Sequence, residues 1–74
     1  MDKILIVEDD QDIAELIMVN LQELSLKSEH CLTGEQALER IAKEEYQLIL
    51  LDVMLPGISG LVVCRKVRES KHGQ

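Results

Sequence analysis

Three acidic side chains that follow two aliphatic segments carry the strongest chemical signal in this sequence. Glu8 and Asp9 follow residues 4–7, and Asp52 follows residues 48–51. Short, unbroken aliphatic segments are typical of strands that are buried on both faces of a parallel sheet. Neighbouring parallel strands lie about 4.8 Å apart, so their carboxyl ends would bring the three carboxylates together. Such crowding is unfavourable unless a cation or protons relieve it, which predicts a divalent metal site that includes an aspartate.

A carboxylate in such a site can act as a nucleophile and form an aspartyl phosphate. Phosphoryl transfer requires that the charge of the phosphate be neutralised, and Mg²⁺ serves this purpose. Mg²⁺ prefers oxygen ligands in octahedral geometry and usually takes one or two carboxylates together with waters. One attacking aspartate and two metal-holding acids fit that requirement.

The rest of the pattern predicts alternating strands and helices that would position these groups. We expect strands over residues 3–7, 27–32 and 47–51, and helices over about 12–25, from Thr33 to near Glu45, and over about 60–70. Thr33 and Gln36 form a capping box at the start of the second helix. The order β-α-β-α-β-α implies parallel strands with right-handed crossovers.

Helical spacing also predicts which side of each helix is buried. In the first helix the expected buried positions are Ile13, Leu16, Ile17, Leu21 and Leu24. In the third helix they are Leu61, Val63, Cys64 and Val67. Residues 27–32 are polar enough for an edge strand, whereas residues 47–51 are too apolar for one.

Length and charge limit the possible classes of protein. The chain has 74 residues and a net charge of −6, which suits one small domain or a piece of one. Residues 1–37 contain nine acidic side chains and two basic ones, which argues against a nucleic-acid or anionic-membrane surface in this half.

The cysteines and the apolar segments bear on the compartment. Cys31 and Cys64 have no partner at a metal-ligand spacing, so we expect two free thiols and a reducing compartment. We expect neither a signal peptide nor a membrane span, because no segment approaches the roughly 20 apolar residues that a span needs. A cytoplasmic location is the expectation that follows.

Two motifs resemble the receiver domain of two-component response regulators. They are residues 3–10, KILIVEDD, and residues 48–60, LILLDVMLPGISG. The similarity includes the Thr33-Gly34 start of the second helix and covers nearly the whole chain. It is strongest to the transcription-factor class, in which the first acid of the pair is often Glu.

The resemblance implies a flavodoxin-like, doubly wound fold with its site at the switch point between the first and third strands. Asp52 corresponds to the phospho-acceptor. Asp9 corresponds to a direct Mg²⁺ ligand and Glu8 to one that acts through water, while Asp52 and the backbone carbonyl of Met54 complete the protein ligands. The implied partner is a sensor histidine kinase that donates the phosphoryl group, and the chain is a regulatory acceptor rather than an enzyme.

The sequence also departs from the family pattern. The family has five βα units, whereas residues 1–74 correspond to the first three, a partial receiver domain with strand order 2-1-3. The Ser/Thr of strand four and the Lys of strand five have no counterpart here. There is no output domain either, so contact with DNA would need one outside these residues. We therefore expect Mg²⁺ binding to survive better than phosphoryl transfer and signalling.

Other interpretations remain. The chain can be a non-signalling half-domain that folds by self-association, for example as a dimer through residues 47–51. It can also be an experimental or proteolytic fragment of a longer protein. A haloacid-dehalogenase-type phosphatase is disfavoured because Met54 stands where a second Asp is needed. The glycines form neither a phosphate-binding loop nor a dinucleotide fingerprint.

Overall fold

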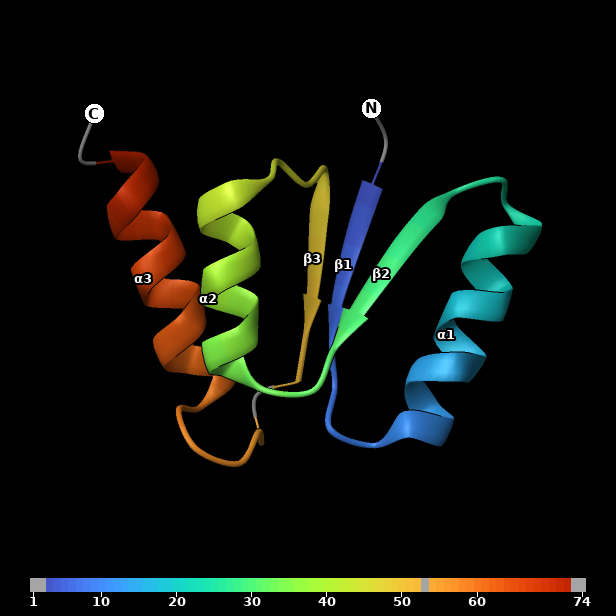
Figure 1. The fold of residues 1–74 in the computed structure, drawn as a ribbon, viewed down its shortest axis with the longest axis horizontal. Coiled ribbons are helices and arrows are strands. Elements are labelled where there is room, and N and C mark those ends of the chain that lie inside the picture. Colours follow the sequence, from blue (N-terminus) through green and yellow to red (C-terminus); the bar gives the residue numbers. More distant parts are fainter. Residues whose placement is uncertain (1–2, 53, 73–74) are drawn as a thin grey trace.

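The computed structural model describes residues 3–52 and 54–72. Six elements alternate along this part of the chain: β1 (Lys3–Val7), α1 (Gln11–Glu23), β2 (Lys27–Cys31), α2 (Gly34–Lys43), β3 (Leu48–Leu51) and α3 (Gly60–His72). The strands form a parallel sheet in the order β2-β1-β3. Helix α1 covers one face of the sheet, and α2 and α3 cover the other (Figure 1). The predicted α/β class and strand order are confirmed.

The central strand β1 supplies the core on both faces of the sheet. Ile4 and Ile6 pack with Ala14 beneath α1, and Leu5 and Val7 point to the opposite face, toward α2 and α3. All five side chains are buried. This alternation follows from the strand period of two, and burial of each large aliphatic side chain contributes about 1.5–3 kcal/mol.

The buried side of α1 differs from the side that the helical spacing predicted. Leu16 is 65% exposed, and Ile13 and Leu24 are exposed as well, so the prediction is wrong for these three residues. Ala14 is fully buried because its small side chain lets the helix approach the sheet closely. The line of residues that packs against β1 is Ala14, Ile17, Met18 and Leu21.

The end of α1 is set by backbone hydrogen bonds rather than by its apolar pattern. The Ser25 N–H donates to Gln22 O at 2.9 Å, and the Leu26 N–H donates to Leu21 O at 3.0 Å. Ser25 takes a φ of 62°, and this left-handed conformation together with the two hydrogen bonds forms a Schellman motif, a common helix C-terminal motif. The helix therefore ends at Glu23, two residues before the predicted end.

Thr33 caps the start of α2 as predicted. Its side chain accepts the Gln36 N–H at 3.1 Å. The reciprocal bond of the capping box is shifted by one residue, because Gln36 Oε1 accepts the Leu32 N–H at 2.9 Å instead of that of Thr33. The helix ends at Lys43, slightly before the predicted end.

The third βα unit is only partly covered. Val63 is fully buried, as predicted, but Leu61 is 69% exposed, so its predicted burial is wrong. Helix α3 packs against the sheet through Val63 and Val67, and Leu61 lies on its exposed side. Leu48 in β3 is 49% exposed, and β3 forms an edge of the sheet over the described residues. Its apolar sequence had predicted an interior position.

A polar cluster joins β1, β2 and α2 at the end of the sheet opposite the strand carboxyl ends. Glu29 Oε1 accepts the Tyr46 hydroxyl at 2.7 Å and the Arg40 guanidinium at 3.1 Å, and Glu29 Oε2 lies 3.3 Å from Lys3 Nζ. The Tyr46 hydrogen bond is the main reason that the pKa of Glu29 is lowered, because it outweighs the opposing effect of burial. Lys3 also pairs with Glu44.

Both cysteines are free thiols, as predicted, with Cys31 buried and Cys64 half-buried. Burial raises the pKa of the Cys31 thiol. Within residues 3–52 and 54–72, no helix has the length and hydropathy needed to cross a membrane.

Candidate functional site

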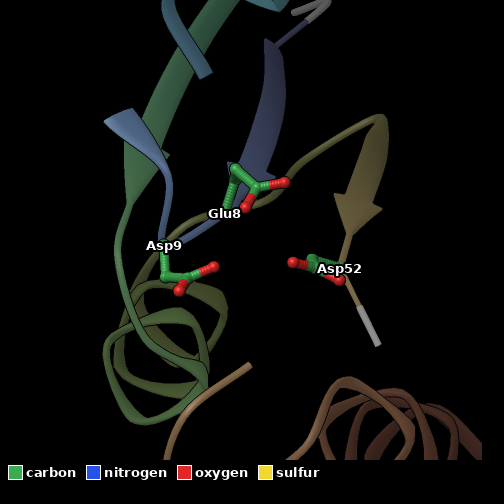
Figure 2. A group of neighbouring side chains, drawn as sticks. All are labelled: Glu8, Asp9 and Asp52. Atoms are coloured by element: carbon green, nitrogen blue, oxygen red, sulfur yellow. The ribbon is translucent and has the colours of Figure 1, made fainter. Parts of the chain in front are cut away.

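The carboxylates of Glu8, Asp9 and Asp52 converge at the carboxyl ends of two adjacent strands. One ligand oxygen from each lies within 4.8 Å of the others. Figure 2 shows the three side chains directed toward a common space between the β1–α1 loop and the end of β3. The pairing of β1 with β3 brings them together, because the Asp52 N–H donates to Val7 O at 3.1 Å. The crowding expected from the sequence is therefore present.

Asp52 is half-buried, and one of its oxygens is fixed. The Met54 N–H donates to Asp52 Oδ1 at 2.9 Å, which orients the carboxylate at the point where the chain leaves β3. The Met54 side chain is 82% exposed. The expectation that its backbone carbonyl faces a metal stays a prediction.

Glu8 is held by its own loop. Its Oε2 accepts the Asp10 N–H at 3.1 Å. This hydrogen bond lowers the pKa of Glu8, but partial burial and the neighbouring Asp9 and Asp52 carboxylates act in the opposite direction and prevail. The net pKa of Glu8 is raised, as expected for a carboxylate close to others of the same charge.

The other acids near the site have structural roles. Asp10 is the N-cap of α1, and its Oδ1 accepts the N–H groups of Asp12 and Ile13 at 3.0 and 3.2 Å. Asp12 lies in the first turn of α1, where a negative charge is favourable near the amino end of the helix. Asp9, between Asp10 and Glu8, is exposed and directs its carboxylate toward Asp52 (Figure 2).

The donor set fits a small, hard divalent cation. Three carboxylate oxygens are the ligand type that Mg²⁺ prefers, and adjacent ligands in an octahedron of its size lie about 3 Å apart. The observed separations, within 4.8 Å, need only small side-chain movements or one bridging water. A cation would also remove the repulsion that raises the pKa of Glu8.

One residue beside the site was not found from the sequence. His30, in β2, has its Nε2 atom 2.7 Å from the backbone carbonyl oxygen of Glu8. The available signal was positional, because the predicted parallel pairing puts the carboxyl end of residues 27–32 next to Glu8. The adjacent Cys31 points to the opposite face of the sheet and packs in the core.

The fold and the site together define a class of protein. A doubly wound parallel sheet with an acidic cluster at the ends of β1 and β3 has its ligand site where the strand order reverses. The family model described as response regulator receiver domain matches residues 4–74. The chain belongs to the response regulator receiver family.

Two curated relatives are similar over nearly the whole chain. The regulatory protein VanR of Enterococcus faecium is 46% identical over 71 residues, which are 96% of this chain and 30% of that protein. The response regulator ArlR of Staphylococcus saprophyticus subsp. saprophyticus is 42% identical over 71 residues, 96% of this chain and 32% of that protein. The chain thus spans about a third of the length of these relatives.

Two solved structures that contain a response regulator share this fold. The response regulator TrrA of Thermotoga maritima, in complex with Mg²⁺ and BeF, matches with a TM-score of 0.93 and 39% identity over 97% of this chain and 63% of that one. The complex of the histidine kinase ThkA with TrrA matches with a TM-score of 0.88 and 39% identity over 93% of this chain and 60% of that one.

Proposed function

We propose that this chain is the Mg²⁺-dependent phospho-acceptor part of a two-component response regulator, with Asp52 as the acceptor. The observation that carries the proposal is the convergence of Asp52 with Glu8 and Asp9 in a chain of the receiver family. Asp9 would bind the cation directly, Glu8 would bind it through water, and Asp52 and the Met54 carbonyl would complete the protein ligands. The cation neutralises charge on the phosphoryl group and on the carboxylates around it.

The position of Asp52 suits it to accept a phosphoryl group. Met54 fixes Oδ1 with a backbone hydrogen bond, so we assign the attack on phosphorus to Oδ2. The phosphoryl donor is a phosphohistidine of the kinase. The new bond joins Oδ2 to phosphorus as the bond from phosphorus to the histidine nitrogen breaks. In this proposal the chain is the substrate of a kinase and is not itself an enzyme. We also propose that it is located in the cytoplasm.

The proposed partner is a sensor histidine kinase. Support comes from the structurally similar TrrA, which has been solved in complex with the histidine kinase ThkA. A phosphohistidine must reach Asp52, so the docking surface must border the carboxyl ends of the strands. The first turns of α1 lie at this end of the sheet (Figure 1) and expose Ile13 and Leu16. Ile13 and Leu16 are three residues apart and thus neighbours on the helix surface, and a contiguous apolar patch of this kind can serve as an interaction surface.

For the 74 residues in isolation, we expect only part of the activity of a receiver domain. They contain Mg²⁺-binding carboxylates, but not the Ser/Thr and Lys that the family pattern supplies from strands four and five. We therefore propose that the isolated chain binds Mg²⁺ well, accepts the phosphoryl group slowly and transmits no output.

Calorimetric titration with MgCl₂ tests the metal-binding part of this proposal. Asp9→Asn is expected to raise the Kd for Mg²⁺ by at least about tenfold, because a direct charged ligand is lost. Asp12→Asn is the matched control, since it removes an equal charge from the first turn of α1, and it is expected to change the Kd little. Equal Mg²⁺ affinity in Asp9→Asn and the unmodified chain would contradict the proposal.

A second candidate function is that of a self-associating half-domain without signalling activity. The specific observation in its favour is the apolar edge of β3. On the α1 face, Ile17 and Leu50 line a hollow that borders Asp52, and on the other face Leu51 and Cys64 line another. A second copy that pairs along β3 would cover both hollows and form a dimer with a wider sheet.

A further inference from the structure

We propose that His30 is a positioning residue for the metal site, acting through the peptide group between Glu8 and Asp9. This inference rests on the proposed Mg²⁺ site and adds a residue of β2 to it. His30 Nε2 lies 2.7 Å from Glu8 O, and the ring is partly buried. A carbonyl oxygen only accepts, so Nε2 carries a hydrogen atom and donates it to this oxygen.

The hydrogen bond from His30 is the second of two bonds that hold the Glu8 backbone against β2, a pair that we call the clamp. The Glu8 N–H donates to Cys31 O at 3.1 Å, and the Glu8 carbonyl accepts from His30. Both backbone polar groups of Glu8 are thus bound by successive residues of one strand. His30 can reach the carbonyl because it pairs with Ile6 in the parallel register and extends past the end of β1.

The clamp matters for Asp9 because one peptide plane contains both the Glu8 carbonyl and the Asp9 nitrogen. Holding that carbonyl restricts rotation of the plane, and the plane sets the direction in which the Asp9 side chain leaves the backbone. Asp9 is exposed, so packing does little to orient it. The carboxylate of Glu8 has a separate anchor in the Asp10 N–H. The strongest effect of His30 therefore falls on Asp9, the proposed direct ligand.

Groups that orient metal ligands from outside commonly change metal affinity by 10–100-fold when they are removed. His30→Leu removes the donor, and we expect it to raise the Kd for Mg²⁺ by about tenfold. His30→Gln is expected to restore most of the affinity, because the amide nitrogen of Gln occupies nearly the same place as Nε2. His30→Asn keeps an amide but is too short to reach, so its affinity should resemble that of His30→Leu.

The experiment is calorimetric titration of each variant with MgCl₂ at one pH and ionic strength, together with urea unfolding of the metal-free proteins. Ser28→Ala is the matched control, because Ser28 lies on the same strand and face but pairs with Ile4, away from the site. A merely structural histidine would alter the unfolding curves and leave the Kd unchanged. Comparing Gln with Asn keeps the test decisive if His30→Leu does not fold.

The outcomes separate this inference from the proposal on which it rests. Loss of affinity in His30→Asn with recovery in His30→Gln supports the positioning role. An unmodified chain that binds Mg²⁺ while all His30 variants bind it equally well overturns the role of His30 alone. An equal loss of Mg²⁺ affinity in His30→Gln and His30→Asn also overturns it, because a donor at the position of Nε2 then does not determine the affinity. Absence of Mg²⁺ binding in the unmodified chain overturns both proposals.

Discussion

Glu8, Asp9 and Asp52 repel one another at neutral pH when no cation lies among them. The pKa of Glu8 is raised in the folded chain despite its hydrogen bond from Asp10. A carboxyl group whose pKa is raised by folding contributes stability at low pH, and this contribution is lost as the pH rises through the folded pKa. The acidic cluster therefore lowers the stability of the metal-free protein above about pH 4.3, the ordinary pKa of glutamate.

Asp52→Asn is expected to stabilise the metal-free chain. The substitution removes one of the three charges and keeps the Oδ1 acceptor for the Met54 N–H. We expect the free energy of unfolding at pH 7 to rise by up to about 1 kcal/mol, the usual range for partly exposed charges. Urea denaturation followed by circular dichroism measures this change.

Two conditions make the test of Asp52→Asn specific. The gain should shrink when saturating Mg²⁺ is added, because the cation relieves the same repulsion in the unmodified chain. It should also shrink as the pH falls through the raised pKa of Glu8, because a protonated Glu8 no longer repels Asp52. Asp12→Asn should give no gain, because Asp12 lies favourably in the first turn of α1. A gain that is independent of both Mg²⁺ and pH would show that repulsion is not its cause.

At the scale of elements, the strands and the site could be predicted because their signals are local. Uninterrupted aliphatic segments that end in acids mark both strand and site, as at Glu8 and Asp52. The buried side of α1 could not be predicted in the same way. Apolar residues occur nearly all round this helix, so periodicity alone does not select the line through Ala14 and Ile17 that faces the sheet. The contact of His30 depends on the register of β2 against β1, and a polar strand such as residues 27–32 specifies its register only weakly.

Tyr46→Phe is expected to destabilise the chain, because it removes a hydrogen bond between β2 and the α2–β3 connection. It removes the hydroxyl that donates to Glu29 Oε1 and keeps the ring, whose centroid lies 5.1 Å from Lys3 Nζ. We expect a loss of about 1 kcal/mol in the free energy of unfolding at pH 7, as for a hydrogen bond that is partly open to water. Urea denaturation measures the loss.

The effect of Tyr46→Phe should depend on pH with a defined sign. The pKa of Glu29 is lowered, first by the Tyr46 hydrogen bond and then by Lys3 and Arg40, although burial acts in the opposite direction. The stability that this carboxylate contributes is present above the ordinary pKa of glutamate and is lost as the pH falls through the lower folded value. The difference between Tyr46→Phe and the unmodified chain should therefore be smaller at pH 3 than at pH 7. A difference that grows on acidification would contradict this role for Glu29.

The whole molecule is thin in one direction. Its extents are 35 × 28 × 15 Å, and Figure 1 looks down the shortest of these axes. Its radius of gyration of 12.0 Å slightly exceeds the roughly 11 Å expected for a compact chain of this length. Nine hydrophobic side chains of the described residues are buried, a small core for an independent domain. The pairing of β1 with β3 brings the three carboxylates together, and β2 adds the His30 contact to Glu8, so a sheet of three strands can still assemble the site.

Leu48→Lys tests whether a second copy covers the edge of β3. A lysine on an exposed strand edge opposes edge-to-edge pairing. We expect the unmodified chain to form dimers at micromolar concentration and Leu48→Lys to shift it toward monomers, as followed by sedimentation velocity. Leu61→Lys is the control, because Leu61 is also an exposed leucine but lies on α3. A folded monomer at all concentrations in the unmodified chain would contradict self-association and leave the metal site unaffected.

The central claim is that Asp52 accepts a phosphoryl group with the help of Mg²⁺. Its most direct test is intact-mass measurement after incubation with a small-molecule acyl phosphate, with and without MgCl₂, on the unmodified chain and on Asp52→Asn. We expect the mass to increase by one phosphoryl group only in the unmodified chain and only with Mg²⁺. An equal increase in Asp52→Asn, or no increase in the unmodified chain at any Mg²⁺ concentration, would contradict the claim.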